Sequence, residues 1–472
     1  MNVRELVLDM LLQMEAEGTY SNRLVRDVLD KYDYLEGKEK AFLKRLSEGT
    51  VERQIQIDYI LNYYSKVPVR KMKPLIRCVL RMGVYQILFM DGVLDAAACN
   101  EAVKLAAKRK FGQLKGFVNG VLRSIAREKE NIEEIYPDKK KEPLQYLSVV
   151  YSMPEHLVSM WLEDYGRKQT EKMLQAMLEV HPVTIRLRQD LDGWEVGKET
   201  AKREGDGKRK TGGEAREWLL DRMREAGVQV RRHPYLNYAY CLTHLEGVKN
   251  LPGFREGLFT VQDVSSMLAV ECAGIKAGDF VLDVCAAPGG KGTHAAELLK
   301  GTGKALCRDI SEEKAALIRE NAERLGLTNI EVEVHDARVY DAALCAKADV
   351  VLADLPCSGL GVLGKKRDIK YHVTQESMEE LQNLQKELLD VVWRYVKPAG
   401  TLLYTTCTIH KEENEEMARW FLENHPFRMA ELSPFLKKAP EIGMTGDGFL
   451  QLLPGVHETD GFFIAKFIRE DV

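Results

Sequence analysis

Residues 280–294 read FVLDVCAAPGGKGTH, and this stretch predicts the architecture of the second half of the chain. Its first part, FVLDVC, is short, apolar and rich in β-branched residues, as expected of a strand buried on both faces of a sheet. Small residues then lead into a helix, and the adjacent Gly289 and Gly290 let a ligand approach the backbone closely. A strand, a small-residue loop and a helix in this order are typical of the first unit of a parallel sheet.

Further segments of the same kind follow, with helical patterns between them. They are KALCRD (304–309), IEVEVHD (330–336), ADVVLAD (348–354) and GTLLYTTC (400–407). Apolar strands that alternate with helices predict an α/β fold with a doubly wound, mostly parallel, Rossmann-like sheet. Ligands of such sheets bind at the carboxyl ends of the strands.

Three known kinds of ligand-binding loop compete for residues 285–294. A P-loop fails twice, because it requires glycine where Cys285 stands and Ser or Thr where Gly292 stands. The dinucleotide fingerprint G-x-G-x-x-A fits residues 290–295, but its first glycine should follow the strand directly, whereas Gly290 trails it by five positions. We therefore favour the third kind, a loop for S-adenosylmethionine.

Three of the predicted strands end in an acid. Asp309 can hold a ribose diol, Asp336 can accept a hydrogen bond from an adenine amine, and Asp354 ends the fourth strand. Each acid alone is more often an ordinary turn residue. Together on one sheet edge, after a small-residue loop, they favour a nucleoside cofactor.

Two cysteines are expected at the ends of adjacent strands. Cys357 follows the fourth strand in ADLPCSGLG (353–361), and Cys407 ends the fifth. Either thiol alone is better explained as a small buried hydrophobe. The pair beside a methyl donor is different, because carbon 5 of cytosine attacks a sulfonium methyl only after a thiolate has added to carbon 6. A second group must then help to remove the carbon 5 proton, and the residues alone leave open which thiol attacks.

Charged neighbours can tune such a thiol. A free cysteine has a pKa of about 8.5, so only a few per cent is thiolate at pH 7. Lys291 or the positive sulfonium of the cofactor can lower that pKa. Asp354 can bind the ring nitrogen and amine of the base, which draws electrons from carbon 6 or at least orients the ring.

The N-terminal part, residues 1–130, predicts an all-helical domain, because apolar residues recur at helical spacing from Val3 onward. Residues 66–127 contain thirteen Lys and Arg and three acids, a local charge of +10 in a chain of net charge −4. Such a module predicts a polyanionic partner, with nucleic acid first, although a solvated helix face explains a charge run equally well.

Two further regions complete the predicted organisation. Residues 147–255 predict a small α+β middle domain, and residues 256–472 the catalytic domain. Within the middle domain, the stretch 190–213 combines several glycines with dense mixed charge, so we expect a flexible insertion there.

Composition limits the class of protein. A chain of 472 residues with 45% hydrophobic and 30% charged residues is expected to be soluble and to form two or three domains. Nine cysteines without a C-x-x-C pair argue against a disulfide framework and a zinc site, so we expect free thiols and no metal. Acids interrupt the apolar pattern of the first residues, which indicates neither a signal peptide nor a membrane span. We expect a cytoplasmic monomer.

The combination of LDVCAAPGGKGTH, ADLPCSGLG and YTTCTI resembles the RNA cytosine-5 methyltransferases. In that family the Thr-Cys cysteine is the nucleophile and the Pro-Cys cysteine assists release, which implies these roles for Cys407 and Cys357. DNA cytosine-5 methyltransferases instead attack from their Pro-Cys thiol and lack the second motif. The cofactor contacts of the family correspond here to Cys285, Ala286, Ala287, Pro288, Gly289, Gly290, Lys291, Asp309, Asp336 and Asp354.

The resemblance continues outside the catalytic motifs. RMGVYQILFM (81–90), NEAVKLAAK (100–108) and FVNGVLRSI (117–125) resemble the RNA-binding fold of the NusB antitermination factor. EGLFTVQDVSSMLA (256–269) resembles the family's lead-in to the catalytic domain, and TDGFFIAKF (459–467) its closing strand pair. This arrangement implies a bacterial enzyme that methylates carbon 5 of a cytosine in 16S ribosomal RNA.

Four positions depart from the family pattern. Leu355 stands where alanine is usual, Gly292 where threonine is usual, and Arg188 where asparagine is usual. Arg367 precedes Asp368 where a proline is common.

Two alternatives to 16S ribosomal RNA methylation stay open on the sequence. The first is the same chemistry on transfer RNA. The second is an RNA-binding protein with an inert catalytic domain, against which the presence of both thiols and all three acids weighs.

Overall fold

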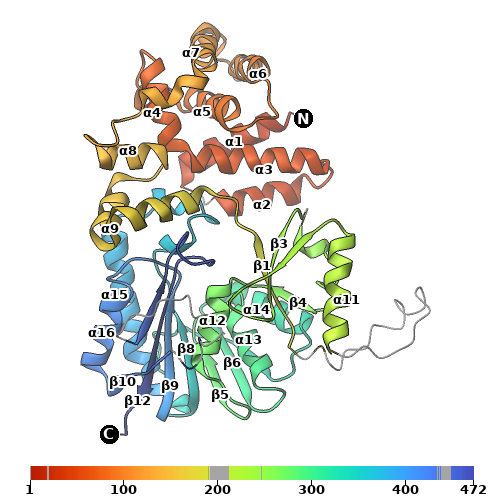
Figure 1. Ribbon diagram of the computed structural model, residues 1–472, viewed down its shortest axis with the longest axis vertical. Coiled ribbons are helices and arrows are strands. Elements are labelled where there is room, and N and C mark those ends of the chain that lie inside the picture. Colours follow the sequence, from red (N-terminus) through yellow and green to blue (C-terminus); the bar gives the residue numbers. More distant parts are fainter. Residues whose placement is uncertain are drawn as a thin grey trace, which may run out of the picture. The chain divides into compact units, whose positions relative to one another are not determined.

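The computed structural model describes residues 2–18, 21–189, 191, 212–245, 247–432, 434, 436 and 448–471. The predicted insertion at 190–213 lies almost wholly outside the described residues. The chain forms two compact units, one of residues 1–179 with 363–373 and one of residues 180–362 with 374–472. Figure 1 labels their elements in chain order.

The first unit is helical, as the apolar spacing of its sequence predicts. Its α-helices are α1 (Val3–Glu17), α2 (Ser21–Lys31), α3 (Gly37–Glu52), α4 (Gln54–Tyr64), α5 (Pro74–Phe89), α6 (Asp95–Lys108), α7 (Lys115–Arg127), α8 (Pro143–Val150) and α9 (Glu155–Leu178). Helix α5 is the most apolar of this core and packs against α1, α3, α4, α6 and α7. Local sequence sets the helix ends: the Asn2 side chain caps α1 at the backbone N–H of Arg4, and Gly18 ends it in the left-handed conformation.

A short segment from the second half of the sequence, residues 363–373, belongs to the first unit. Lys370 is buried, and its ammonium donates to the backbone carbonyls of Glu52 at 2.7 Å and Ser152 at 2.6 Å. Burial lowers the pKa of Lys370 to about 7. Arg367 forms ion pairs with Glu48 and Glu52. The arginine that departs from the family pattern therefore holds this segment against α3.

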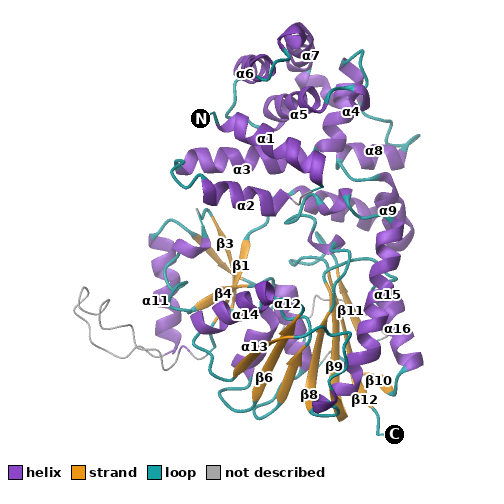
Figure 2. Ribbon diagram, turned by 180° about the vertical axis from the view of Figure 1, so that it is seen from behind, coloured by secondary structure: helices purple, strands orange, loops and turns teal. Residues whose placement is uncertain are grey.

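The second unit begins with a small antiparallel sheet. Its strands are β1 (Val183–Leu187), β2 (Gln229–Arg232), β3 (Ala239–Thr243) and β4 (Phe259–Val261), in the order β2-β3-β1-β4. Helix α11 (Gly212–Glu225) lies beside this sheet (Figure 2). Its Leu219 and Met223 are buried in one cluster with apolar residues of the sheet.

The large sheet of the second unit has the strand order β10-β12-β9-β8-β5-β6-β7, with β11 paired to β12. The strands are β5 (Phe280–Asp283), β6 (Lys304–Asp309), β7 (Ile330–Val334), β8 (Ala348–Asp354), β9 (Val396–Thr406), β10 (Phe427–Met429), β11 (Phe449–Leu452) and β12 (Phe462–Arg469). Strands β5 to β9 pair in parallel, and β12 runs antiparallel to β9, β10 and β11. The predicted doubly wound fold is confirmed.

Helices cover both faces of the large sheet because its strands are apolar on both sides. Val281 and Val350 face a layer built from α12 (Val264–Ala273) and α13 (Gly290–Leu298). Their chain neighbours Leu282 and Val351 face the opposite layer, built from α15 (Gln375–Val392) and α16 (Glu415–Asn424). Helix α14 (Glu312–Arg324) packs beside β6 and β7. No helix among the described residues is both long and apolar enough to cross a bilayer.

The strand ends differ from the predicted ones at a few positions that matter for the site. The segments 304–309 and 348–354 form β6 and β8 with the predicted bounds, whereas β5 and β7 each end two residues early. Cys285 and Asp336 therefore lie in the loops that follow these strands. The predicted closing strand pair at 459–467 corresponds to the single strand β12, whose partners are β9, β10 and β11.

A buried ion pair joins the small sheet to α13. Arg186 on β1 is 1% exposed, and its guanidinium lies 2.6 Å from the carboxylate of Glu297 on α13. The same guanidinium donates to the side chains of Gln262 at 2.8 Å and Thr293 at 3.3 Å. Removing one member of such a pair leaves an uncompensated buried charge.

We expect Arg186→Met to lower the free energy of unfolding by about 3 kcal/mol, because Glu297 loses its partner inside the protein. The double variant Arg186→Met with Glu297→Met should regain most of that loss, since neither charge is then buried alone. Urea unfolding followed by tryptophan fluorescence measures both. Strictly additive effects of the two substitutions would contradict this coupling.

Candidate active site

The loop between β5 and α13 is fixed to the end of β6. The backbone N–H of Ala286 donates to the carbonyl of Arg308 at 2.9 Å, and the N–H of Ala287 donates to the Asp309 carboxylate at 2.9 Å. Asn321 on α14 donates to the carbonyl of Pro288 at 2.9 Å. Through these bonds the structure brings the predicted loop 285–290 and the predicted acid Asp309 together.

Gly292 in the first turn of α13 is explained by close packing. A Cβ atom there would lie 2.3 Å from the sulfur of Cys307 on β6 and 3.3 Å from a carboxylate oxygen of Asp283. The threonine that is usual at this position therefore has no room here. The glycine lets α13 approach β5 and β6 directly behind the loop.

The other two predicted acids have different surroundings. Asp336, in the loop after β7, is held on both oxygens by the Arg338 guanidinium, with a shortest distance of 2.7 Å, and these bonds lower its pKa. Asp354, at the end of β8, accepts from the Thr405 hydroxyl at 2.7 Å and from Lys291 at 2.7 Å. The structure thus joins Asp354 to Lys291, while Asp336 pairs with its own chain neighbour.

The sequence analysis missed Asp283, the last residue of β5. Its carboxylate is buried, and neither oxygen has a hydrogen-bond partner among the described residues. The backbone N–H of Cys285 is near enough to lower the pKa slightly, but it lacks the geometry of a hydrogen bond. Burial is the main cause that raises the pKa of Asp283 to about 7, and the negative charge of the nearby Asp354 is the second. A buried carboxylate without a partner at a strand end is suited to a cationic ligand group.

The two thiols meet at the ends of β8 and β9. The sulfurs of Cys357 and Cys407 are 3.4 Å apart, and both side chains are half-buried. The hydrogen bond with Cys407, followed by burial, raises the pKa of the Cys357 thiol well above its usual value. The 3.4 Å contact lets one sulfur of the pair donate its proton to the other. None of the nine cysteines forms a disulfide bond, as predicted.

Lys291 is a cation that interacts with Cys407 of this pair. Burial opposes its charge, but the carboxylate of Asp354 outweighs burial and raises the pKa of Lys291, with Cys407 also contributing. The ammonium also lies 5.1 Å from the centre of the Phe462 ring. Lys291 is therefore a permanent positive charge that acts on both Asp354 and Cys407.

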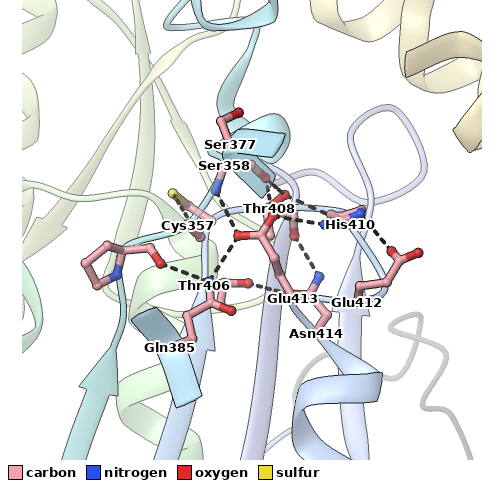
Figure 3. A network of polar contacts seen from close by, with 12 residues as sticks. Cys357, Ser358, Ser377, Gln385, Thr406, Thr408, His410, Glu412, Glu413 and Asn414 are labelled. Atoms are coloured by element: carbon pink, nitrogen blue, oxygen red, sulfur yellow. Dashed lines mark hydrogen bonds and ion pairs between the residues drawn. The ribbon is translucent and has the colours of Figure 1, made fainter. Parts of the chain in front are cut away.

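A second residue that the sequence analysis missed is Glu413, which lies between the two cysteine loops. Figure 3 shows the side chains of Ser358, Thr408 and His410 gathered around its carboxylate. Glu413 is fully buried. It belongs to the run KEENEE (411–416), which reads in the sequence as the exposed start of a helix.

Comparison with known proteins identifies the family. The family described as "16S rRNA methyltransferase RsmB/F" matches residues 272–468, and the NusB family matches residues 1–127. The probable ribosomal RNA small subunit methyltransferase B of Bacillus subtilis is 35% identical over 473 residues, 99% of each chain. The ribosomal RNA small subunit methyltransferase B of Cronobacter sakazakii is 30% identical over 475 residues, again 99% of each chain. The chain belongs to the ribosomal RNA small subunit methyltransferase B family.

Solved structures agree with this membership. The similarity to the crystal structure of PH0851 covers 100% of this chain and 99% of the PH0851 chain, with 27% identity and a TM-score of 0.76. The similarity to a methyltransferase homologue from Pyrococcus horikoshii covers 69% of this chain and 99% of the homologue, with 26% identity and a TM-score of 0.54. The predicted membership of the RNA methyltransferases and the predicted fold are confirmed.

The residues at the strand ends fit S-adenosylmethionine, the cofactor of this family. The buried carboxylate of Asp283 has no hydrogen-bond partner among the described residues, so it would hold the ammonium of the methionine part. Asp309 stands at the end of β6, where a ribose diol is expected, and Asp336 follows β7, where the adenine amine is expected. The small residues of the loop 285–290 leave the backbone open to the ligand.

We expect Asp283→Asn to weaken cofactor binding and yet to stabilise the free protein at neutral pH. Between the unfolded pKa of 3.8 and the folded value of about 7, the folded state holds a proton that the unfolded state lacks. The free energy of unfolding of the native sequence should therefore fall by up to about 1.4 kcal/mol per pH unit across this window and level off above it. Asparagine stays neutral and removes this slope.

Urea unfolding between pH 4 and pH 8 measures the stability difference, and calorimetric titration with S-adenosylhomocysteine measures cofactor affinity. As the pH rises to 7, the free energy of unfolding of the Asn variant should increase relative to that of the native sequence. Parallel stability curves would show that Asp283 is ionised in the free protein.

Proposed function

We propose that this protein transfers the methyl group of S-adenosylmethionine to carbon 5 of a cytosine in 16S ribosomal RNA, through a transient bond between Cys407 and carbon 6 of the base. The 3.4 Å contact between the sulfurs of Cys407 and Cys357 carries this proposal. The family supplies the substrate, because its members are small-subunit ribosomal RNA methyltransferases. Such a substrate also implies action in the cytoplasm.

The surroundings of the two thiols support Cys407 as the nucleophile. We assign the shared proton to Cys357, whose pKa is raised by the hydrogen bond with Cys407 and by burial, so that Cys357 is the donor toward Cys407. Lys291 adds a positive charge on the Cys407 side. A thiolate is favoured where a donor and a cation face it, and the thiolate is the reactive form.

The reaction then follows from the chemistry of the pyrimidine ring. The Cys407 thiolate forms a bond to carbon 6, and the electron pair of the carbon 5–carbon 6 double bond becomes available at carbon 5. S-adenosylmethionine supplies the sulfonium-bound methyl group that carbon 5 takes up. Removal of the carbon 5 proton restores the double bond, and the electrons of the carbon–sulfur bond return to Cys407. Cys357 assists this last step, and one proton is released for each methyl group.

Asp354 and Lys291 are suited to the base and the charge at this site. The Thr405 hydroxyl and the Lys291 ammonium each occupy one oxygen of Asp354, so the carboxylate is held in a fixed orientation. A fixed carboxylate can bind the exocyclic amine and orient the ring over Cys407. The base must leave its helix or loop to reach this position.

We expect Cys357→Ala to accumulate a denaturation-resistant adduct with 16S ribosomal RNA when S-adenosylmethionine is present, because release is blocked after attack. Cys407→Ala should form no adduct. Denaturing gel electrophoresis of labelled RNA measures both, and transfer RNA should give no adduct with either variant.

Thermal unfolding of the two alanine variants provides the control for folding. An adduct with Cys407→Ala alone would reverse the roles of the two thiols. A variant without either thiol that still methylated at the native rate would contradict the covalent mechanism.

The helical unit supports a role in RNA binding through a part of its positive charge. Among the thirteen cations of residues 66–127, Arg77, Arg81, Lys104, Lys108 and Arg109 form ion pairs with nearby acids. The others are exposed and have no ion pair within the described part of the chain; they are Lys66, Arg70, Lys71, Lys73, Lys110, Lys115, Arg123 and Arg127. We propose that the exposed set contacts phosphates of the RNA.

Replacement of Lys110, Lys115, Arg123 and Arg127 by glutamine should flatten the salt dependence of RNA binding. The slope of log K against log salt should change by roughly 3, because each lost phosphate contact removes about 0.7–0.9. Filter binding to a 16S ribosomal RNA fragment at several salt concentrations measures the slope.

The double variant Lys104→Gln with Lys108→Gln is the matched control. These charges face Glu101 and Glu5, so their loss should change the slope by roughly 1 or less. Equal slopes for the native sequence and the fourfold variant would show that the exposed cations only solvate a helix face.

A further inference from the structure

We propose that Glu413 is a positioning residue, whose buried carboxylate holds the Pro-Cys loop and the Thr-Cys loop so that the two sulfurs stay within reach of one cytosine. The inference rests on the proposed function and deepens it. Within the described part of the chain Glu413 makes no hydrogen bond to either sulfur, and it holds them through the neighbours of Cys357 and Cys407.

Glu413 fixes the Pro-Cys loop on both sides of Cys357. The backbone N–H of Ser358 donates to one carboxylate oxygen at 2.9 Å, and the Ser358 hydroxyl donates to the other at 2.5 Å. The amide of Gln385 on α15 donates both to the same carboxylate at 3.0 Å and to the carbonyl of Pro356 at 2.9 Å. The residues directly before and after Cys357 are thereby tied to one group.

The same carboxylate reaches the Thr-Cys loop through Ser358. The single hydroxyl proton of Ser358 is used on Glu413, so Ser358 must accept from the Thr408 hydroxyl, 2.7 Å away. Thr408 follows Cys407 directly. The ring nitrogen Nδ1 of His410 also lies 3.1 Å from the Glu413 carboxylate. Residues from both loops therefore converge on Glu413 (Figure 3).

The backbone around Glu413 belongs to the same arrangement. The Tyr404 hydroxyl donates to the Glu413 carbonyl at 2.5 Å. The neighbouring Asn414 donates to the carbonyl of Thr408 at 3.0 Å and accepts from the Thr406 hydroxyl at 2.5 Å. The residues before and after Cys407 are thus held by Asn414 while Glu413 holds those around Cys357.

A carboxylate accepts from every donor of this set. Its oxygens face an N–H, a hydroxyl and an amide NH₂ group. A glutamine of the same size that keeps its oxygen toward the N–H and the Gln385 amide presents an NH₂ group to Ser358. The Ser358 hydroxyl then loses its charged acceptor, and its hydrogen bond with Thr408 must reverse, which changes the link between the two loops. The side chain is 0% exposed, so water does not replace the lost bond.

The test is Glu413→Gln with phenylarsine oxide as a probe of the sulfur–sulfur distance. Trivalent arsenic in this reagent binds two nearby thiols and releases water, so its affinity reports whether both sulfurs are in place. We expect the variant to bind the probe roughly 10- to 100-fold more weakly, the factor expected for loss of a hydrogen bond to a buried charged group. Single-turnover methylation of 16S ribosomal RNA should fall by a similar factor.

Glu416→Gln is the matched control. Glu416 lies on the exposed side of α16, and its substitution removes the same charge as Glu413→Gln does. Cys357→Ala defines the affinity expected when only one thiol of the pair remains. A merely structural role would lower the melting temperature of Glu413→Gln but leave the affinity of its folded form for the probe unchanged. That result would overturn the proposal.

Ser358→Ala provides a second variant if Glu413→Gln does not fold. It removes the hydroxyl link to Thr408 but keeps the backbone N–H bond, so a smaller loss of probe affinity is expected, and native affinity would overturn the proposal. The proposed function can fail separately. If the native protein and Cys357→Ala form no RNA adduct, while Glu413→Gln still binds phenylarsine oxide more weakly, the cytosine chemistry is wrong but the positioning role of Glu413 stands.

Discussion

The pairing of β8 with β9 brings the two thiols together. Asp354 and Thr405 are register partners in this parallel pair, so the chain positions just beyond them leave the sheet side by side. Cys357 and Cys407 occupy those positions, although they are separated by fifty positions in the sequence. A slip in this register would separate the sulfurs and would also turn the side chains of β9 to the wrong face of the sheet. The apolar pattern that buries β8 and β9 on both faces therefore sets the chemistry as well as the fold.

The charges at this sheet edge are suited to a cationic ligand. Asp283, Asp309 and Asp354 lie near one another, and burial, followed by the charge of Asp354, raises the pKa of Asp283 to about 7. Burial is the main cause that raises the pKa of the Cys285 thiol, and the same three acids raise it further. Cys285 is therefore suited to lining the loop and not to nucleophilic attack. Lys291 offsets part of the negative charge, and a positively charged sulfonium would offset more. The site therefore gains in electrostatic balance when the methyl donor is bound.

Much of the fold and the reactive pair could be predicted because the relevant signals are local. The strand segments are apolar over four to eight residues, and the thiols stand at recognisable strand ends. Asp283 could not be recognised, because its lack of a partner depends on which strands and helices surround it. Glu413 was hidden for a related reason: within KEENEE it has the same local pattern as the exposed Glu416, and only the packing of α16 beside the two loops buries it. The membership of residues 363–373 in the helical unit likewise depends on buried contacts of Lys370 that no local pattern encodes.

A buried carboxylate between two loops is a costly way to gain stability, since removing the charge from water must be balanced by several donors. An apolar side chain of similar size would fill the same space at lower cost, but it would give Ser358 and Thr408 no preferred direction. Hydrogen bonds are directional, and a network with every donor satisfied selects one arrangement of its members. A reaction in which one sulfur attacks and another assists release requires such a fixed arrangement, because a displacement of about 1 Å in a reacting group can cost two orders of magnitude in rate. The Glu413 network is therefore better explained by the geometry of the two thiols than by the stability of the core.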